Sequence, residues 1–262
     1  MARYLRLYAH FLRFTFARSA QFRLDFGFRI LMDTLWYGHY LVFFAVLGET
    51  TTSLGGWDVA QVRVFTGTLF VVDALQMTFV ANGMWNLPQA INRGDLDYHL
   101  VRPVSTLFFV TAREISASSF VNLLMAVGVL AWAIATYPGS VPATTLLVFV
   151  ATLPLGLAIH AALHLVFLVP QFWTQSSKGL RDVFWSALNY AFRPDGIYRG
   201  YLRRLLTTLL PLAVIASYPA RIVIEGPRPG LVLHILAAAV GSWTVAIWLW
   251  GRGLRAYGSA SS

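Results

Sequence analysis

The chain contains no cysteine. This absence excludes disulfide bonds, thiolate metal sites and cysteine nucleophiles. Charge is also scarce: 12% of the 262 residues are charged, whereas soluble domains carry roughly 25%. Lysine is almost missing, since nineteen of the twenty basic residues are arginine and the one lysine is Lys178.

The sequence also lacks the patterns that carry nucleotide or acyl chemistry. No Gly-x-x-x-x-Gly-Lys-Ser/Thr loop occurs, and Lys178 is followed by Gly179. We therefore do not expect the chain to bind ATP itself. No nucleophile elbow surrounds any serine. We expect no catalytic residue, metal or cofactor in this chain, and hence no enzyme activity of its own.

What the sequence has in abundance is apolar surface. Hydrophobic residues make up 57% and aromatic residues 15% of the chain, and the mean hydropathy is +0.62. These values indicate an all-α integral membrane protein, whose length suits about six helical spans of ~20 residues. The net charge of +9 comes from basic residues that flank the apolar runs. It therefore indicates membrane topology and anionic lipid headgroups rather than nucleic acid.

The apolar runs divide a single transmembrane domain, residues 1–262, into six parts. We expect a basic amphipathic interfacial helix at 1–23, spans one and two in 24–85, a polar segment at 86–103, spans three and four in 104–172, a fifth span with broken helices in 173–230, and span six at 231–252. The distribution of basic residues places both termini and the polar segment on the cytoplasmic side of the membrane.

The fifth span has two placements. Residues 205–224 can cross directly, or residues 176–192 can cross while 196–226 form a broken, re-entrant hairpin at the outer face. The positive-inside rule favours the first placement. Pro211 and Pro219 favour the second, because broken helices occur at membrane depth where protein or water covers the backbone.

Asp33 and Asp73 are acidic residues that lie inside apolar runs, away from the ends of the runs. Asp73 is in the middle of the second run, where a carboxylate is costly unless it is paired or hydrated. Asp33 shares a helix face with Arg29, four residues earlier. Asp33 and Asp73 either line a path for cationic or polar cargo or pair between helices; we favour pairing for Arg29 and Asp33 and weigh the two roles equally for Asp73.

Aromatic and histidine residues in the spans have a simpler interpretation. Phe70 and Phe79 are able to stack against an aromatic cargo, although packing in the core is the commoner role. His160 and His164 are four residues apart, as a metal pair would be, but no acidic residue lies in that span. We therefore favour a structural or cavity-lining role for both histidines.

The polar segment contains the most distinctive stretch of the chain. It reads Ile91-Asn-Arg-Gly-Asp-Leu-Asp-Tyr-His-Leu-Val-Arg-Pro103 and concentrates four charges between two apolar runs. Gly94 permits a backbone bend that other residues resist. Pro103 biases Arg102 toward an extended conformation. The stretch is either an ordinary solvated loop or an element built for contact with a partner.

This stretch resembles the segment after span two in bacterial ABC exporter permeases of the second type, and more narrowly a compact six-span subfamily. A second match is Arg193-Pro-Asp-Gly-Ile-Tyr198, followed by Leu210-Pro-Leu212 and Tyr218-Pro-Ala220. Together the two motifs and the order of the spans cover essentially the whole chain.

The resemblance implies a permease subunit of an ATP-driven exporter in the bacterial plasma membrane. ATP and Mg would be bound by separate ATP-binding cassette subunits, expected in two copies. A second permease chain, in a heterodimer rather than a homodimer, would complete the translocation path within the lipid. Residues 1–23 would be an elbow helix, and Pro211 and Pro219 would belong to an outer gate. The contacts with the ATPase would come from a coupling helix containing Asn92, Arg93, Gly94, Asp95, Asp97 and Arg102.

Two other classes of protein fit the composition. A channel or ion-coupled carrier would transport without a partner and often shows internal repeats, which are not visible here. An intramembrane lipid-modifying enzyme would need clustered catalytic groups, and the acidic residues of this chain are scattered.

Overall fold

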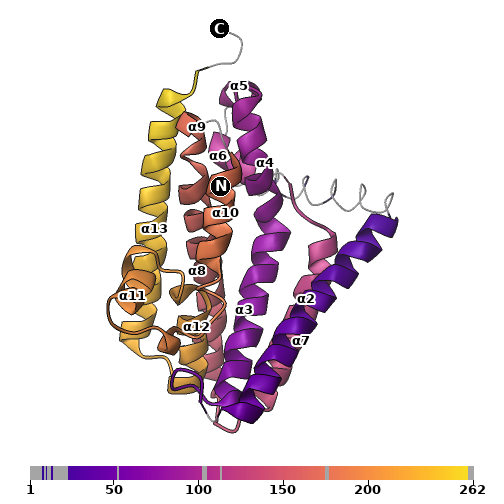
Figure 1. The fold of residues 1–262 in the computed structure, drawn as a ribbon, viewed down its shortest axis with the longest axis vertical. Coiled ribbons are helices and arrows are strands. Elements are labelled where there is room, and N and C mark those ends of the chain that lie inside the picture. The colour runs from indigo at the N-terminus through magenta and orange to yellow at the C-terminus, as the bar shows by residue number, and fades with distance from the viewer. Residues whose placement is uncertain are drawn as a thin grey trace.

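The computed structural model describes residues 23–51, 53–101, 105–112, 114–174 and 177–258, together with Tyr8, His10 and Arg13. This part of the chain is helical and contains no β-strand (Figure 1). The expected interfacial helix at 1–23 lies almost entirely outside the described residues. The helices are α2 (Arg23–Thr50), α3 (Val59–Phe79), α4 (Ala81–Asn92), α5 (Asp97–Leu100), α6 (Thr106–Ala112), α7 (Ser118–Ala135), α8 (Ala143–Leu168), α9 (Gln171–Thr174), α10 (Ser177–Leu188), α11 (Gly200–Arg204), α12 (Val214–Glu225) and α13 (Pro229–Ala256), with short η1 (Asp195–Ile197) and π-helical η2 (Leu205–Leu209) segments.

Five of the described helices are long and apolar enough to cross a membrane. They are α2, α3, α7, α8 and α13, and a bent pair of helical segments in 200–225 brings the count to as many as six. The fold is therefore that of an all-α membrane protein, as the composition predicts. Figure 1 shows the polar α4–α5 segment and the end of α13 at one end of the bundle, and the loop between α2 and α3 at the other.

Helix α3 is the central element of the bundle. It starts at a capping box, in which the Asp58 carboxylate accepts from the Gln61 backbone N–H at 2.8 Å and the Gln61 side chain accepts from the Asp58 N–H at 3.1 Å. Such a box satisfies two N–H groups that the first helical turn leaves open. From there α3 packs against α7, α8 and α12, and most of its residues are buried, among them Phe65 and Phe70.

Small residues allow the closest helix contacts. A Cβ added at Gly156 of α8 would lie 2.5 Å from the backbone oxygen of Ile215 in α12. Glycine at this position therefore permits close approach of two backbones, as small residues do between helices in membranes.

The third apolar run does not form one long helix. The structure divides it into α6 and α7, and the intervening Ser116 N–H donates to the carbonyl oxygen of Thr78 at 2.9 Å. A helix cannot continue where its backbone donor is bound to a different helix, so this contact separates α6 from α7.

The segment before α13 contains the break that its prolines predict. The stretches 200–209 and 214–225 meet at 97°, and Pro211 lies between them. Residues 205–224 therefore do not form a straight span. This geometry agrees with a broken or re-entrant segment, while the stretch that crosses the membrane as span five stays a prediction.

The contact between α8 and α12 generates a test of stability. Gly156→Ala should lower the free energy of unfolding by about 1–3 kcal/mol, because the new methyl group meets a backbone oxygen that cannot rotate away. Gly128→Ala in α7 is the matched control, since a Cβ there meets nothing within 4 Å. Thermal unfolding of the purified chain in detergent measures both. Equal unfolding temperatures for the two variants would contradict the close packing of α8 on α12.

Candidate functional site at the polar end of the bundle

The polar segment 91–101 forms a short helical turn at one end of the bundle. Helix α4 ends at Asn92, and Gly94 follows with a φ of 78°, a left-handed conformation that favours glycine. The chain then turns into α5. The predicted bend at Gly94 is thus present, and it directs residues 95–101 back toward α6, which packs on both α4 and α5.

The predicted contact residues of this segment are accessible to different degrees. Asn92 and Arg93 are exposed, whereas Asp95 and Asp97 are half-buried. Arg102 and Pro103 lie outside the described residues. Next to the acidic pair, Tyr98 and Val101 are 72% and 84% exposed. An exposed aromatic and an exposed β-branched side chain beside charges make a surface suited to contact with another protein.

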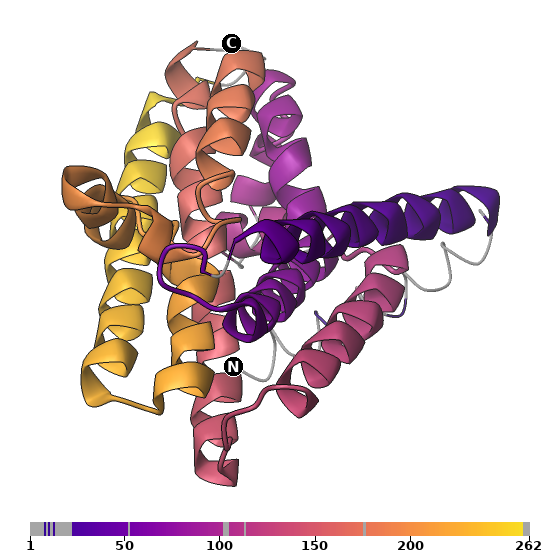
Figure 2. The same cartoon turned by 60° about the horizontal axis from the view of Figure 1, so that its bottom comes forward.

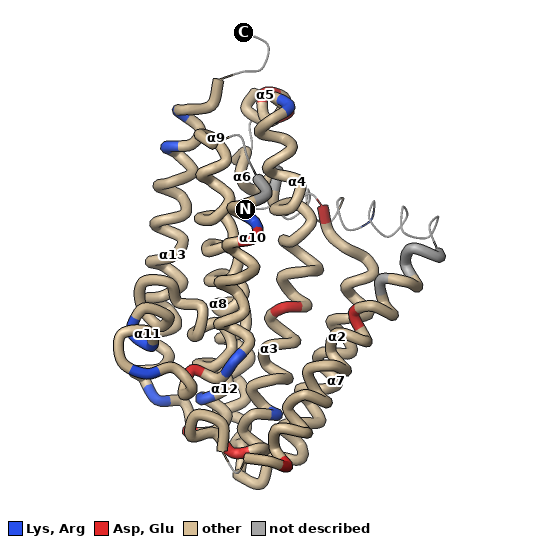
Figure 3. The backbone as a smooth tube through the Cα atoms, viewed as in Figure 1, with Lys and Arg blue, Asp and Glu red and all other residues tan. Residues whose placement is uncertain are grey.

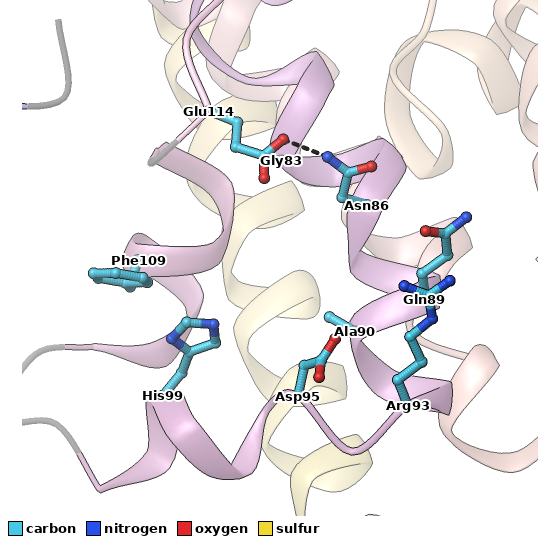
Figure 4. Close-up of a pocket in the computed structure, with 9 residues that line it drawn as sticks. All are labelled: Gly83, Asn86, Gln89, Ala90, Arg93, Asp95, His99, Phe109 and Glu114. Atoms are coloured by element: carbon cyan, nitrogen blue, oxygen red, sulfur yellow. Dashed lines mark hydrogen bonds between the residues drawn. The ribbon is translucent and has the colours of Figure 1, made fainter. Parts of the chain in front are cut away.

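A cavity of about 170 Å³ lies on the inner side of this turn. Figure 4 shows Asp95 and His99 from the turn and Glu114 and Asn86 from above pointing into it, while Arg93 lies along α4 beside Gln89. The Asn86 amide donates to the Glu114 carboxylate. The cavity is therefore polar and carries two carboxylates.

An apolar cluster fixes the turn to distant parts of the chain. Leu87, Ile91 and Leu96 are buried against residues of α8, α9 and α13, including Phe172 and Trp250. This cluster is separate from the main core around α3. The polar segment therefore packs on the ends of two later spans and does not hang from the bundle as a free loop.

Polar contacts strengthen the same connection. The Gln171 side-chain amide of α9 donates to the side-chain oxygen of Asn92 at 2.7 Å. Tyr257, which follows α13, lies beside Asp97; burial first and the neighbouring Asp97 carboxylate second raise the pKa of its hydroxyl. The phenol therefore stays protonated at neutral pH and presents a hydroxyl to the turn.

The two acidic residues within the spans lie on neighbouring helices. Asp73 of α3 is buried, Asp33 of α2 is half-buried, and they are close enough for their charges to interact. The Tyr37 hydroxyl, which donates to the Phe70 carbonyl at 3.3 Å, is near both. The side chain of Arg29 lies outside the described residues.

The two phenylalanines of the predicted path differ in their surroundings. Phe70 is fully buried and stacks on Tyr37 with ring centroids 4.1 Å apart. Phe79 is half-buried and meets the edge of Phe120 at 5.6 Å. Phe79 is therefore the more accessible of the two within this chain.

The histidines of α8 are packed side chains. His164 stacks on Phe184 at 4.3 Å, and its Nδ1 atom lies 3.4 Å from the side-chain nitrogen of Gln76. His160 is buried beside the same phenylalanine. Among the described residues, no group of three or more metal-ligating side chains occurs.

An ionic cluster, which the sequence does not predict, lies toward the other end of the bundle. The carboxylate of Asp195 has no exposed surface; it accepts from Arg221 at 2.9 Å and from Arg203 at 3.0 Å. Arg221 also bonds Glu225 and lies over the Trp57 ring at 5.0 Å. The one signal in the sequence is that Asp195 is the only acidic residue among the arginines of 193–204.

The prolines of the predicted outer gate lie next to this cluster. Pro211 is at the break between η2 and α12, and Pro219 is buried inside α12, two residues before Arg221. The break and the ionic cluster therefore belong to one region of the structure. Whether this region opens and closes stays a prediction.

These features define a polytopic helical membrane protein with a structured polar turn at one end of its spans. A family model described as ABC-2 family transporter protein matches residues 34–261, and the chain belongs to this family. It is thus a membrane component of an ABC transporter, a class of proteins that works with ATP-binding cassette ATPases. No curated protein and no solved structure matches the chain.

The Asp195 cluster generates a prediction on stability. Arg221→Gln should lower the free energy of unfolding by about 1.5–3 kcal/mol, because it removes charge-assisted hydrogen bonds from the buried Asp195 carboxylate, which keeps Arg203 as a partner. Arg203→Gln should cost about 1 kcal/mol or less, because 47% of the Arg203 side chain is exposed. Thermal unfolding in detergent compares the two. A larger loss for Arg203→Gln would show that Arg221 is not the principal partner.

Proposed function

We propose that this chain is the permease subunit of an ATP-driven exporter, moved by separate ATPase subunits that bind the turn at 86–103. The observation that carries the proposal is the attachment of this turn. It joins α3 through α4, and it packs on α8, on α9 that follows it, and on α13. A partner that displaces the turn would therefore displace three membrane helices, which an ordinary solvated loop would not do.

The chemistry of the turn suits such a partner. Arg93, Asp95 and Asp97 offer directional charged contacts around the exposed Tyr98 and Val101. Asn92 accepts a hydrogen bond from Gln171 and is also exposed, so it would belong both to the attachment and to the contact surface. ATP and Mg would be bound by the partner subunits, two of which would serve a pair of permease chains in the bacterial plasma membrane, with both termini and the turn on the cytoplasmic side.

A second permease chain would complete the path. Helix α2 supports this arrangement. Only 11% of the residues in its most apolar stretch are buried, and yet the helix carries Asp33 and the exposed His39. Polar residues within membrane spans face protein or water rather than lipid. Asp33 and Asp73 would then bias the path toward cationic cargo, with Phe79 as a stacking surface, in a heterodimer as the subfamily resemblance suggests.

The break at Pro211 would serve as the outer gate of this path. It lies at the end of the bundle opposite the turn, and Pro219 limits the backbone hydrogen bonds of α12. The ion pairs of the buried Asp195 would keep α11 and α12 in a fixed arrangement while the spans tilt.

Reversing the charges of the turn tests the coupling role. Asp95→Lys with Asp97→Lys should reduce stimulation of the partner ATPase by the permease roughly tenfold or more, because like charges placed in an interface cost several kcal/mol. The measurement is ATP hydrolysis by the co-expressed complex in proteoliposomes, together with co-purification of the ATPase.

Glu49→Lys is the matched control, since Glu49 is exposed at the opposite end of the bundle. It should leave both measurements unchanged. If the double variant also assembles and hydrolyses ATP normally, the ATPase binds elsewhere.

Asp73→Asn tests the path. The substitution keeps the shape of the side chain and removes its charge, so uptake of a lipophilic cationic dye into inside-out vesicles should fall at least about tenfold if the carboxylate attracts cargo. Expression and unfolding temperature should stay unchanged. Normal uptake at normal expression would assign Asp73 to helix packing instead.

A further inference from the structure

Residues 199–204 form an exposed basic surface on the side of the bundle, in the half that is farther from the polar turn. Arg199, Arg203 and Arg204 are all exposed, and between them Tyr201 is 79% exposed. Figure 3 shows the basic positions of this region gathered on α11 and its neighbours, at the side of the bundle. An exposed aromatic ring among arginines is the composition of a helix at a membrane surface.

The orientation of this stretch fits that composition. Residues 200–209 meet α12 at 97°, and α12 itself packs along α3 and α8. The stretch therefore lies across the direction of the spans, as Figure 2 shows for α11. A helix that lies across a transmembrane bundle is parallel to the membrane surface.

The depth of the stretch follows from its contacts. Arg203 shares the Asp195 carboxylate with Arg221, and Arg221 lies over Trp57, two residues before α3. At the same end of α3, Arg63 lies over Trp132 at 5.5 Å. Tryptophan rings with cationic partners mark the boundary between hydrocarbon and headgroups, so α11 is at headgroup level.

Two of the three arginines have their charge available. Arg203 is bound to Asp195, whereas Arg199 and Arg204 form no ion pair with any residue that the structure describes. A guanidinium at headgroup level needs an anionic partner, and its planar pair of N–H donors matches the oxygens of a phosphate.

We propose that residues 199–204 bind the phosphate groups of anionic phospholipids, with Arg199 and Arg204 as the ligands and Tyr201 inserted beside the acyl chains. The proposed function enters only in assigning these lipids to the outer leaflet of the membrane. The binding itself requires no ATPase and no transport.

Native mass spectrometry of the purified full-length chain, titrated with phosphatidylglycerol and separately with phosphatidylcholine, tests the proposal. The unmodified chain should bind the first phosphatidylglycerol molecule more tightly than the first phosphatidylcholine molecule. Arg199→Gln with Arg204→Gln should weaken that site roughly thirtyfold, since each arginine near an anionic surface contributes about 1 kcal/mol. Each single variant should weaken the site about fivefold, which keeps the test open if the double variant fails to fold.

Two controls separate the site from general charge. Arg199→Lys with Arg204→Lys keeps the cations and should stay within about threefold of the parent. Arg228→Gln removes a cation that is already paired with Glu225 at the same end and should change nothing. The proposal is overturned if the double Gln variant binds phosphatidylglycerol like the parent, if inorganic phosphate displaces the lipid equally well, or if the variant loses a co-purifying protein while lipid binding persists.

Discussion

A single buried carboxylate holds together the most irregular part of this protein. Asp195 receives Arg203 from one side of the break and Arg221 from the other, and its backbone N–H donates to the Ser217 hydroxyl at 3.1 Å. A broken helix in a membrane leaves backbone groups that lipid cannot satisfy. An unpaired charge there would be equally costly. The carboxylate and both arginines must therefore be brought in together, which fixes α11 against α12 and, through Arg221 and Trp57, against the start of α3.

Helix α3 connects this cluster with the polar turn. One end begins at the Asp58 cap beside Trp57, the middle carries Asp73, and the other end continues through α4 to Gly94. The polar turn also packs on α9 and α13. A central helix that is attached at both ends would transmit displacement from one membrane surface to the other, as the proposed coupling to an ATPase requires.

Several features of the fold could be predicted because their signals are local. Long apolar runs bounded by charge identify spans wherever they occur, and Gly94 within a charged stretch indicates a bend whatever surrounds it. Pro211 likewise indicates a break. The division between α6 and α7 could not be predicted in this way. It depends on the hydrogen bond that the Ser116 N–H donates to the Thr78 carbonyl oxygen on α3, a residue far away in the chain. The length of 104–137 and its charged pair Arg113 and Glu114 indicate that the first turns project beyond the bilayer, but they do not show that the helix is interrupted.

The sequence by itself determined the class of the protein, the order of its apolar runs, the position of the polar turn and the motifs that point to an ABC permease. Only the tertiary structure decided which polar groups meet. Asn92 and Gln171 are 79 residues apart, and Asp195 and Arg221 are 26 apart. The physical reason is that hydropathy and turn chemistry act between near neighbours in the chain. The partner of a buried charge, in contrast, is chosen by the packing of whole helices, and the sequence around Asp195 offered several exposed arginines without showing which one reaches it.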